Sequence, residues 1–171
     1  MFGKKKFSSD KELYIRILNN FPNPIWRANK SGKCDFFNKA WLDFTGRSME
    51  QEMGDGWTEG VHPDDLKGCV SGYLDSFNRR VPFKLEYRVR HVDGSYHWLL
   101  DFGSPFYDND GEFLGYIGSC YDENEVKKSI EKIHKDNAEL EELNIIMSKR
   151  EKKMLEMKEE IERLKRKCGE M

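Results

Sequence analysis

Residues 83–98 read FKLEYRVRHVDGSYHW, and this stretch decides the fold. From Phe83 to Arg90 apolar and charged side chains alternate, which is typical of a strand with one buried face. Asp93-Gly94 is a strong two-residue hairpin turn. A second strand is predicted from Tyr96 to Tyr107, so the stretch indicates an antiparallel pair.

Three further strands are predicted on either side of this pair. Asp108-Asn109-Asp110-Gly111 is another turn, and it leads into a strand from Phe113 to Tyr121. Upstream, Ile25–Ala28 and Cys34–Phe37 form a predicted hairpin around a turn at residues 29–32. The sequence therefore predicts five antiparallel strands.

Helices are predicted before and between the strands. Residues 9–12 (SDKE) have the capping-box pattern, which indicates an N-terminal helix running to about Asn20. Residues 38–45 form a short predicted helix that ends at Gly46. Another helix begins at Pro63 and runs to about Arg79, and we assign its first-turn acids to the helix dipole rather than to catalysis. This order predicts an α+β domain with helices packed on one sheet.

The last 49 residues differ in composition from the rest of the chain. All four Trp, seven Tyr, eleven Phe and five Pro occur before Glu123, while Glu, Lys, Leu, Ile and Met dominate afterwards. Such helix formers predict one long C-terminal helix. We expect the domain organisation 1–20 for an N-terminal cap helix, 21–122 for the folded domain and 123–171 for the long helix.

The long helix carries a seven-residue apolar repeat. Its a positions are Val126, Ile133, Leu140, Met147, Met154, Ile161 and Cys168. The d positions are interrupted by Ser129, Asp136 and Arg150. A heptad repeat predicts a coiled coil, and a second copy of the chain is the simplest partner. A solvated single helix is the alternative. The expected seam of a parallel homodimer is Ile133, Leu140, Leu143, Met147, Met154, Met157, Ile161 and Leu164.

Several motifs at the joints of the predicted domain resemble the PAS family, in its PAS/PAC form. They are residues 38–40 (NKA) before Thr45-Gly46, Trp57, residues 62–65 (HPDD), residues 86–88 (EYR), residues 93–98 (DGSYHW), Asp110-Gly111 and residues 115–118 (GYIG). The resemblance covers residues 20–122. It implies a five-stranded antiparallel sheet with short flanking helices and a sensory role.

The resemblance also implies a ligand cavity between the sheet and the helices, although a solid aromatic core is the alternative. Candidate lining residues are Trp41, Trp57, Tyr73, Phe77, Tyr87 and Trp98. We do not expect haem, because residues 63–79 contain no His to serve as an axial ligand. We do not expect a covalent flavin adduct either, since no Cys has Asn-Cys-Arg neighbours. Any cofactor therefore stays unknown at this stage.

In PAS proteins an Asp at the end of the last strand often fixes the following helix to the domain. Asp122 matches that residue, while Glu123 and Asn124 depart from the family's usual Asp-Ile-Thr joint. We therefore predict that Asp122 couples the domain to the long helix.

Composition argues against several other functions. The net charge of −2 gives no positive field for nucleic acid, and no apolar run is long enough to span a membrane. The four cysteines are scattered without metal-ligand spacing. Neither a nucleotide-binding Gly-rich loop nor a Gly-Gly-Asp-Glu-Phe motif occurs, and His134 has no kinase-type neighbours. We expect a cytoplasmic protein with no catalytic apparatus in these residues.

The leading hypothesis is a sensory module for signal transduction, for example in two-component regulation. It would bind a small ligand or a signalling protein partner and relay the change through a dimeric coiled coil. One alternative is a dimerisation or scaffold module that senses nothing. Another is the N-terminal regulatory part of a histidine kinase or a diguanylate cyclase.

Overall fold

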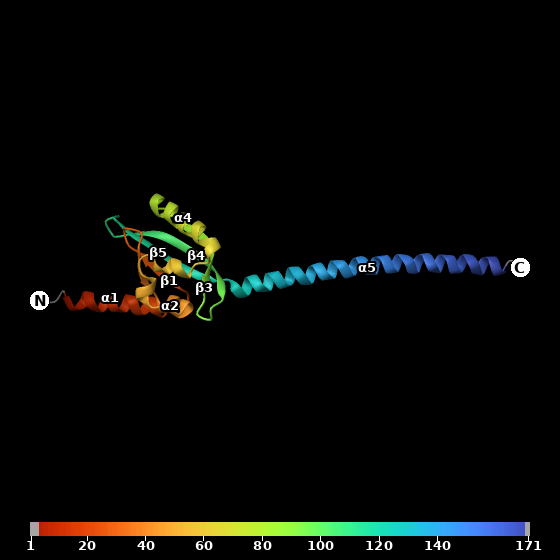
Figure 1. Ribbon diagram of the computed structural model, residues 1–171, viewed down its shortest axis with the longest axis horizontal. Coiled ribbons are helices and arrows are strands. Elements are labelled where there is room, and N and C mark those ends of the chain that lie inside the picture. Colours follow the sequence, from red (N-terminus) through yellow and green to blue (C-terminus); the bar gives the residue numbers. More distant parts are fainter. Residues whose placement is uncertain (1–3, 170–171) are drawn as a thin grey trace. The chain divides into compact units, whose positions relative to one another are not determined.

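The computed structural model describes residues 4–169, with side chains from Glu12 onward. Two compact units divide between Glu125 and Val126. The helices and strands, labelled in Figure 1, are α1 (Lys4–Asn19), β1 (Ile25–Ala28), β2 (Cys34–Phe37), α2 (Lys39–Thr45), α3 (Met49–Glu52), the 3-10 helix η1 (Gly56–Gly60), α4 (Pro63–Arg79), β3 (Phe83–Arg90), β4 (Tyr96–Tyr107), β5 (Phe113–Asp122) and α5 (Asn124–Gly169).

Five antiparallel strands form one sheet in the order β2-β1-β5-β4-β3. The three predicted hairpins supply the β1-β2, β3-β4 and β4-β5 neighbours. β1 pairs along β5 from Ile25 with Ser119 to Ala28 with Tyr116, which brings the first hairpin beside the last strand. The predicted five-stranded antiparallel sheet with flanking helices and a long C-terminal helix is confirmed.

The hydrophobic core lies between the sheet and the helices α2 and α4. Trp41 of α2 and Tyr73 of α4 are buried against Trp26, Tyr87 and Tyr116 of the sheet. In Figure 1, α4 lies beside the long strands that close the domain. Aromatic rings therefore supply most of the volume of this core.

Asn38 joins three elements at the start of α2. Its side chain is fully buried, and its Oδ1 accepts hydrogen bonds from the backbone N–H groups of Ile25 and Trp41. Its Nδ2 donates to the carbonyl oxygens of Leu18 and Asn23. One side chain thus caps α2 and fixes both the end of α1 and the beginning of β1.

The N-terminal helix differs from its prediction at one end. α1 begins at Lys4, so the proposed capping box at residues 9–12 lies inside the helix and does not start it. The helix ends at Asn19, one residue before the predicted end. The short elements α3 and η1 occupy the Gly-rich stretch before α4, for which no helix is predicted. Ser48 caps α3 through a capping box with Gln51.

The second unit contains most of α5, an unbroken helix of 46 residues beginning at Asn124. All eight residues of the predicted seam are exposed, with exposed fractions between 45% and 58%. Covering such an apolar stripe with another surface would stabilise the helix.

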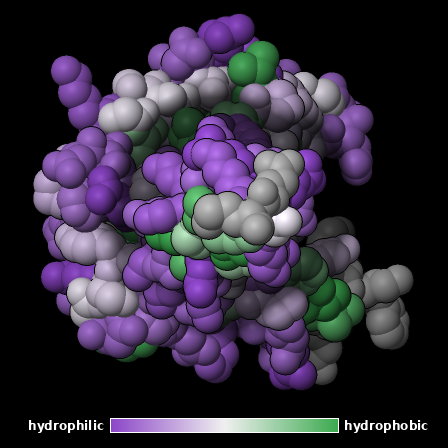
Figure 2. Space-filling view, turned by 90° about the vertical axis from the view of Figure 1, so that its right-hand side faces the viewer, coloured by the Kyte–Doolittle hydropathy of each residue, from purple (hydrophilic) through white to green (hydrophobic). Residues whose placement is uncertain are grey.

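Polar side chains cover most of the face seen in Figure 2, and apolar side chains form small separate patches among them. Within residues 4–169, no helix combines the length and the apolar character that crossing a membrane requires.

Candidate functional site

Two glycines make room for large rings on the inner face of the sheet. Gly118 of β5 pairs with both Trp26 of β1 and Gly103 of β4, and Gly103 pairs with Phe83 of β3. A Cβ at Gly118 would lie 2.3 Å from the Trp26 ring, and one at Gly103 would lie 2.3 Å from the Phe83 ring. The Trp26 and Phe83 rings are stacked, 6.0 Å apart between centroids. The glycines are therefore required for these rings to lie close to the strands.

A buried carboxylate lies beside this aromatic row. Asp101 of β4 is 4% exposed, and its Oδ1 accepts a hydrogen bond of 2.9 Å from the Trp26 indole nitrogen. Its Oδ2 accepts one of 2.9 Å from the Tyr87 hydroxyl. Burial raises the pKa of Asp101 to about 6, while the bonds from Trp26, Tyr87 and Cys120 partly oppose that rise. This carboxyl group can therefore change its charge near neutral pH.

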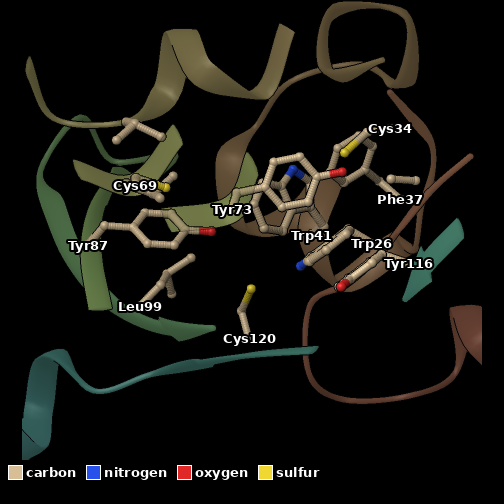
Figure 3. Packing of buried hydrophobic residues seen from close by; sticks show 13 residues of the cluster. Trp26, Cys34, Phe37, Trp41, Cys69, Tyr73, Tyr87, Leu99, Tyr116 and Cys120 are labelled. Carbon is tan, nitrogen blue, oxygen red and sulfur yellow. The ribbon is translucent and has the colours of Figure 1, made fainter. Parts of the chain in front are cut away.

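Figure 3 shows how these polar groups converge. The ring nitrogen of Trp26, the hydroxyl of Tyr87 and the sulfur of Cys120 all point toward one region of the core. Cys120 lies opposite Asp101 in the register of β4 and β5. A polar centre thus sits in an otherwise aromatic interior.

A small cavity adjoins this centre. Its free volume is about 20 Å³, which is about the space of one water molecule. The lining residues are Trp26, Cys34, Phe37, Trp41, Trp57, Cys69, Tyr73, Phe83, Leu85, Tyr87 and Asp101. The cavity is therefore apolar apart from Asp101 and the polar tips of aromatic side chains.

Four of the six predicted lining residues meet at this cavity, namely Trp41, Trp57, Tyr73 and Tyr87. Phe77 lies instead in a neighbouring aromatic group with Phe113 and Tyr116.

Trp98 does not line the cavity and lies next to Arg88, whose guanidinium is 5.2 Å from the Trp98 ring centroid. The neighbouring residues of β4, Leu99 and Asp101, are buried in the core. Because side chains alternate along a strand, Trp98 points to the other side.

Asp101 was missed by the sequence analysis. A signal for it existed, because Leu99 and Asp101 are two residues apart on one strand and so share a face. A charged residue on the buried face of a predicted strand is a candidate for function.

Trp57 and Tyr73 separate the cavity from an open groove. Both residues line the cavity, and both also line a groove of about 730 Å³ between η1, α4 and the β1-β2 turn. Their rings meet edge to face with centroids 6.3 Å apart. A shift of the Trp57 ring would therefore join the two spaces.

The joint to α5 is held by backbone and carboxylate contacts. Asp122 Oδ1 accepts a hydrogen bond of 2.9 Å from the backbone N–H of Asn124, and the Glu123 N–H donates to the carbonyl of Trp98. The other carboxylate oxygen of Asp122 lies 2.8 Å from His97 Nδ1. Asp122, the predicted coupling residue, thus contacts both the β3-β4 hairpin and the first turn of α5.

The acids at the start of α4 have a further role. Arg88 of β3 donates to both carboxylate oxygens of Asp65, at 2.7 Å and 2.8 Å. Hydrogen bonding by Arg88 lowers the pKa of Asp65. The pair ties α4 to the edge strand, so its function is structural.

Comparison with known proteins identifies the family. The sequence model for the PAS fold matches residues 35–120. The chain belongs to the PAS family. We call the cavity between the sheet and the helices the PAS cavity. The family match includes nine of its eleven lining residues, all except Trp26 and Cys34.

Curated relatives of this PAS protein are much longer than the matched region. An uncharacterised protein of Sinorhizobium fredii, y4lL, is 35% identical over 122 residues, which are 70% of this chain and 15% of that protein. Peroxide stress-activated histidine kinase mak1 of Schizosaccharomyces pombe is 26% identical over 83% of this chain and 9% of its own length. Sporulation kinase C of Bacillus subtilis is 23% identical over 80% of this chain and 31% of its own. The PAS chain spans less than a third of each relative.

Solved structures show the same fold. The PAS domain of a Colwellia psychrerythraea protein superposes with a TM-score of 0.56 at 20% identity, covering 68% of this chain and 98% of that one. A sensory box histidine kinase/response regulator of Burkholderia thailandensis gives a TM-score of 0.52 at 23% identity, covering 76% and 96%. The solved structures thus show the fold, while the PAS family match and the histidine kinases among the curated relatives support a sensory role in signal transduction.

The PAS cavity in its closed form is too small for a large cofactor. Its volume of about 20 Å³ is smaller than a haem or a flavin, and its lining residues include no His. Burial raises the pKa of Cys34 and of Cys69, so both thiols lining the cavity are neutral rather than nucleophilic. The cavity as it stands is suited to recognition and not to covalent chemistry.

Proposed function

We propose that this chain is a sensory input module that detects a small ligand at Asp101 and passes the change through β5 to a dimeric α5. The PAS fold and the relatives named histidine kinases support a role in signal transduction. The proposal assigns regulation rather than catalysis to these residues. It places the catalytic output, of histidine kinase type, in a partner or in another part of a longer protein.

The proposal that the chain binds a small ligand rests on the buried Asp101. A buried ionised carboxylate destabilises a fold unless it is paired, and the partners of Asp101 are three neutral donors, Trp26, Tyr87 and Cys120, rather than a cation. A ligand with an N–H donor or a positive charge would meet the carboxylate that the core leaves without a counter-charge. The surrounding rings would hold the apolar part of such a ligand.

Binding requires the cavity to enlarge, because pockets for small molecules commonly measure about 300–1,000 Å³ and the cavity measures about 20 Å³. Trp57 is the residue we expect to move. It is only partly buried, it belongs to the short helix η1, and it separates the cavity from the open groove. Its displacement would admit a ligand without breaking the sheet.

β5 is the route from the cavity to the long helix. The Cys120 thiol donates a hydrogen bond to Asp101, and Asp122 follows two residues later with its bond from the Asn124 N–H. A change in the bonds of Asp101 would therefore shift the end of β5 and the start of α5. A strand that contacts both places is the simplest physical link between them.

The uncovered apolar stripe of α5 supports the dimer part of the proposal. Leu140 and Leu143 are 56% and 55% exposed, although both lie on the heptad seam. Parallel pairing with a second copy would cover the stripe and place the two PAS domains at the same end of the coiled coil. In such a dimer, a shift of Asp122 and the start of α5 would change how the two helices pack in the coiled coil.

The small cavity favours a second candidate, a dimerisation module that senses no ligand. The two candidates differ in one respect, since only a sensor contains a cavity that admits a molecule. Both candidates use the same α5 seam. An experiment on the cavity alone therefore separates them.

Fragment screening by two-dimensional amide NMR tests the ligand part. We would screen small aromatic amines against the wild type and Cys69→Leu, which fills the cavity from α4. The proposal predicts fragments that shift residues around Asp101 in the wild type and fail to bind Cys69→Leu. Cys168→Leu makes the same exchange at an exposed position and should leave binding unchanged. If fragments bind the wild type and Cys69→Leu equally, or if no fragment binds, the dimerisation module remains as the function.

A further inference from the structure

A cluster of metal-ligating side chains lies in the β3-β4 hairpin, outside the PAS cavity. His91, Asp93 and His97 each offer one ligand atom, and these three atoms lie within 4.8 Å of one another. His91 follows the end of β3, Asp93 is in the turn, and His97 is the second residue of β4. The hairpin turn brings the two histidines together although six positions separate them.

The backbone of the turn holds the three side chains in place. The His91 N–H donates to the Ser95 carbonyl at 2.8 Å, and the Gly94 N–H donates to the His91 carbonyl at 2.9 Å. Asp93 Oδ1 accepts hydrogen bonds from the backbone and the hydroxyl of Ser95. It also lies 3.1 Å from His91 Nδ1. The Asp93 carboxylate is therefore held next to His91.

The two imidazole rings are stacked and supported from one side. Their centroids are 4.3 Å apart and their planes differ by 10°. Phe44 of α2 meets both rings edge to face, with centroid distances of 5.0 Å to His91 and 5.7 Å to His97. The Phe44 carbonyl accepts a hydrogen bond from the Val92 N–H, which fixes the hairpin to the end of α2. These contacts hold the two rings next to each other, and both side chains would have to rotate to direct a nitrogen at one ion.

Asp122 contacts one of the two histidines, His97. An ionised carboxylate only accepts hydrogen bonds, so the 2.8 Å contact with His97 Nδ1 places a proton on that nitrogen. The lone pair of His97 is then on Nε2, where it is free to bind a metal. A carboxylate that holds a ligating His in this way is a regular feature of metal sites.

From this geometry we propose that His91, Asp93 and His97 bind a divalent transition-metal ion of the Zn²⁺ type, with Asp122 as the positioning residue for His97. Two imidazoles and a carboxylate suit Zn²⁺, and a fourth position remains for water. In a tetrahedral site with bonds of about 2.1 Å, ligand atoms lie about 3.4 Å apart. The three ligand atoms lie within 4.8 Å of one another, so side-chain rotation would have to bring them to that spacing.

The site is accessible to an ion. His91, Phe44 and Asp122 line an open groove of about 560 Å³, and the side chains of His91 and Asp93 are 26% and 57% exposed. The same Asp122 accepts the hydrogen bond from Asn124 at the start of α5. Metal binding would therefore act on the joint independently of the PAS cavity, and this inference does not depend on the ligand proposed above.

Isothermal titration with ZnCl₂ on the full chain tests the site. We would use a Cys168→Ser background, since that exposed thiol could bind zinc by itself. The expected result is one ion per chain, with affinity lowered at least tenfold by His91→Gln, His97→Gln and Asp93→Asn. Second-shell carboxylates commonly contribute about 10–100-fold in affinity, so Asp122→Asn should weaken binding within that range. His134→Gln removes an exposed histidine of α5 and should have no effect.

Cobalt substitution separates a built site from adventitious binding. Co²⁺ bound to His91, Asp93 and His97 should give the intense visible bands of a four-coordinate ion, and these should vanish in His97→Gln. Thermal melts in metal-free buffer check that each variant folds. If a histidine variant does not fold, Asp93→Asn still tests the site, because it keeps the turn. Equal zinc affinity in the parent and the hairpin variants, loss of binding in His134→Gln, or no binding at all would overturn the proposal.

Discussion

The indole N–H of Trp26 donates a hydrogen bond of 2.9 Å to Asp101 Oδ1 across the width of β5. Trp26 lies on β1 and Asp101 on β4, and both strands pair with β5 but not with each other. The bond is possible because Gly118 of β5 has no side chain between them. Strand order, a glycine and a buried charge thus act together at the centre of the domain.

Replacing Asp101 with Asn should change how stability depends on pH. The folded pKa of Asp101 is about 6, above its ordinary value of 3.8, so the folded protein keeps this proton where the unfolded chain loses it. The stabilisation is complete below pH 3.8 and is lost as the pH rises through about 6. A shift of two pKa units corresponds to about 3 kcal/mol. Asn mimics the protonated acid, so Asp101→Asn should be more stable than the wild type at pH 7 and similar at pH 4.

Urea unfolding between pH 4 and pH 7 measures this difference. Asp43→Asn is the control, because it removes an exposed carboxylate on α2 and should keep the wild-type pH dependence. A constant difference between wild type and Asp101→Asn at every pH would show that Asp101 does not titrate in this range.

Substitution of Gly118 by Ala should displace Trp26. The new methyl group would lie 2.3 Å from the indole ring, so the ring must move and the bond to Asp101 must break. Overpacking of this kind costs about 1–3 kcal/mol. We expect a lower free energy of unfolding and a red-shifted tryptophan emission, both measured in one urea titration.

Gly68→Ala is the matched control for Gly118→Ala. Gly68 lies inside α4 with nothing within 4 Å of a Cβ, so Ala there should stabilise the protein by about 0.5–1 kcal/mol. Two alanine variants with the same stability would show that Gly118 is not needed for packing.

Asn38→Ala should destabilise the domain strongly. The change removes four hydrogen bonds and leaves the N–H groups of Ile25 and Trp41 without their partner. We expect a loss of about 2–4 kcal/mol in the free energy of unfolding. Asn38→Asp keeps both bonds accepted by Oδ1 and should therefore fall between Asn38→Ala and the wild type. If Asn38→Asp is as damaging as Asn38→Ala, the bonds donated to Leu18 and Asn23 matter more than the helix cap.

The α5 seam predicts a dimer that charge can separate. Leu140→Lys combined with Leu143→Lys places two ammonium groups on the seam of each helix and should give monomers in sedimentation equilibrium. Ile145→Lys is the control, because Ile145 is at an f position and equally exposed at 56%. A dimer that survives the double change would place the interface elsewhere on the chain.

Local patterns predicted the strands because each strand ends at a strong turn. Asp93-Gly94 and residues 108–111 mark the β3-β4 and β4-β5 hairpins, and glycines with φ of 88° and 84° occupy those turns. The N-terminal helix begins before the capping-box pattern at residues 9–12, and its own first residues have no capping pattern that would mark its start. Capping residues also occur inside helices, where they have no such meaning.

The cavity was only partly predictable, since adjacent apolar residues do not reveal which face is buried. Trp98 and Leu99 are both apolar, and the core takes Leu99 and Asp101. The pairing of His91 with His97 depends on the hairpin register, which also brings Val89 opposite His97. Contacts of this kind depend on tertiary structure, and the sequence shows them only once the register is known.

Native mass spectrometry of the purified protein tests the central claim most directly. The sensor account predicts a dimer in which each copy holds one small molecule, released on denaturation and missing from Cys69→Leu. A protein that carries no such molecule, and that gives the same spectrum with and without the filled cavity, would contradict it.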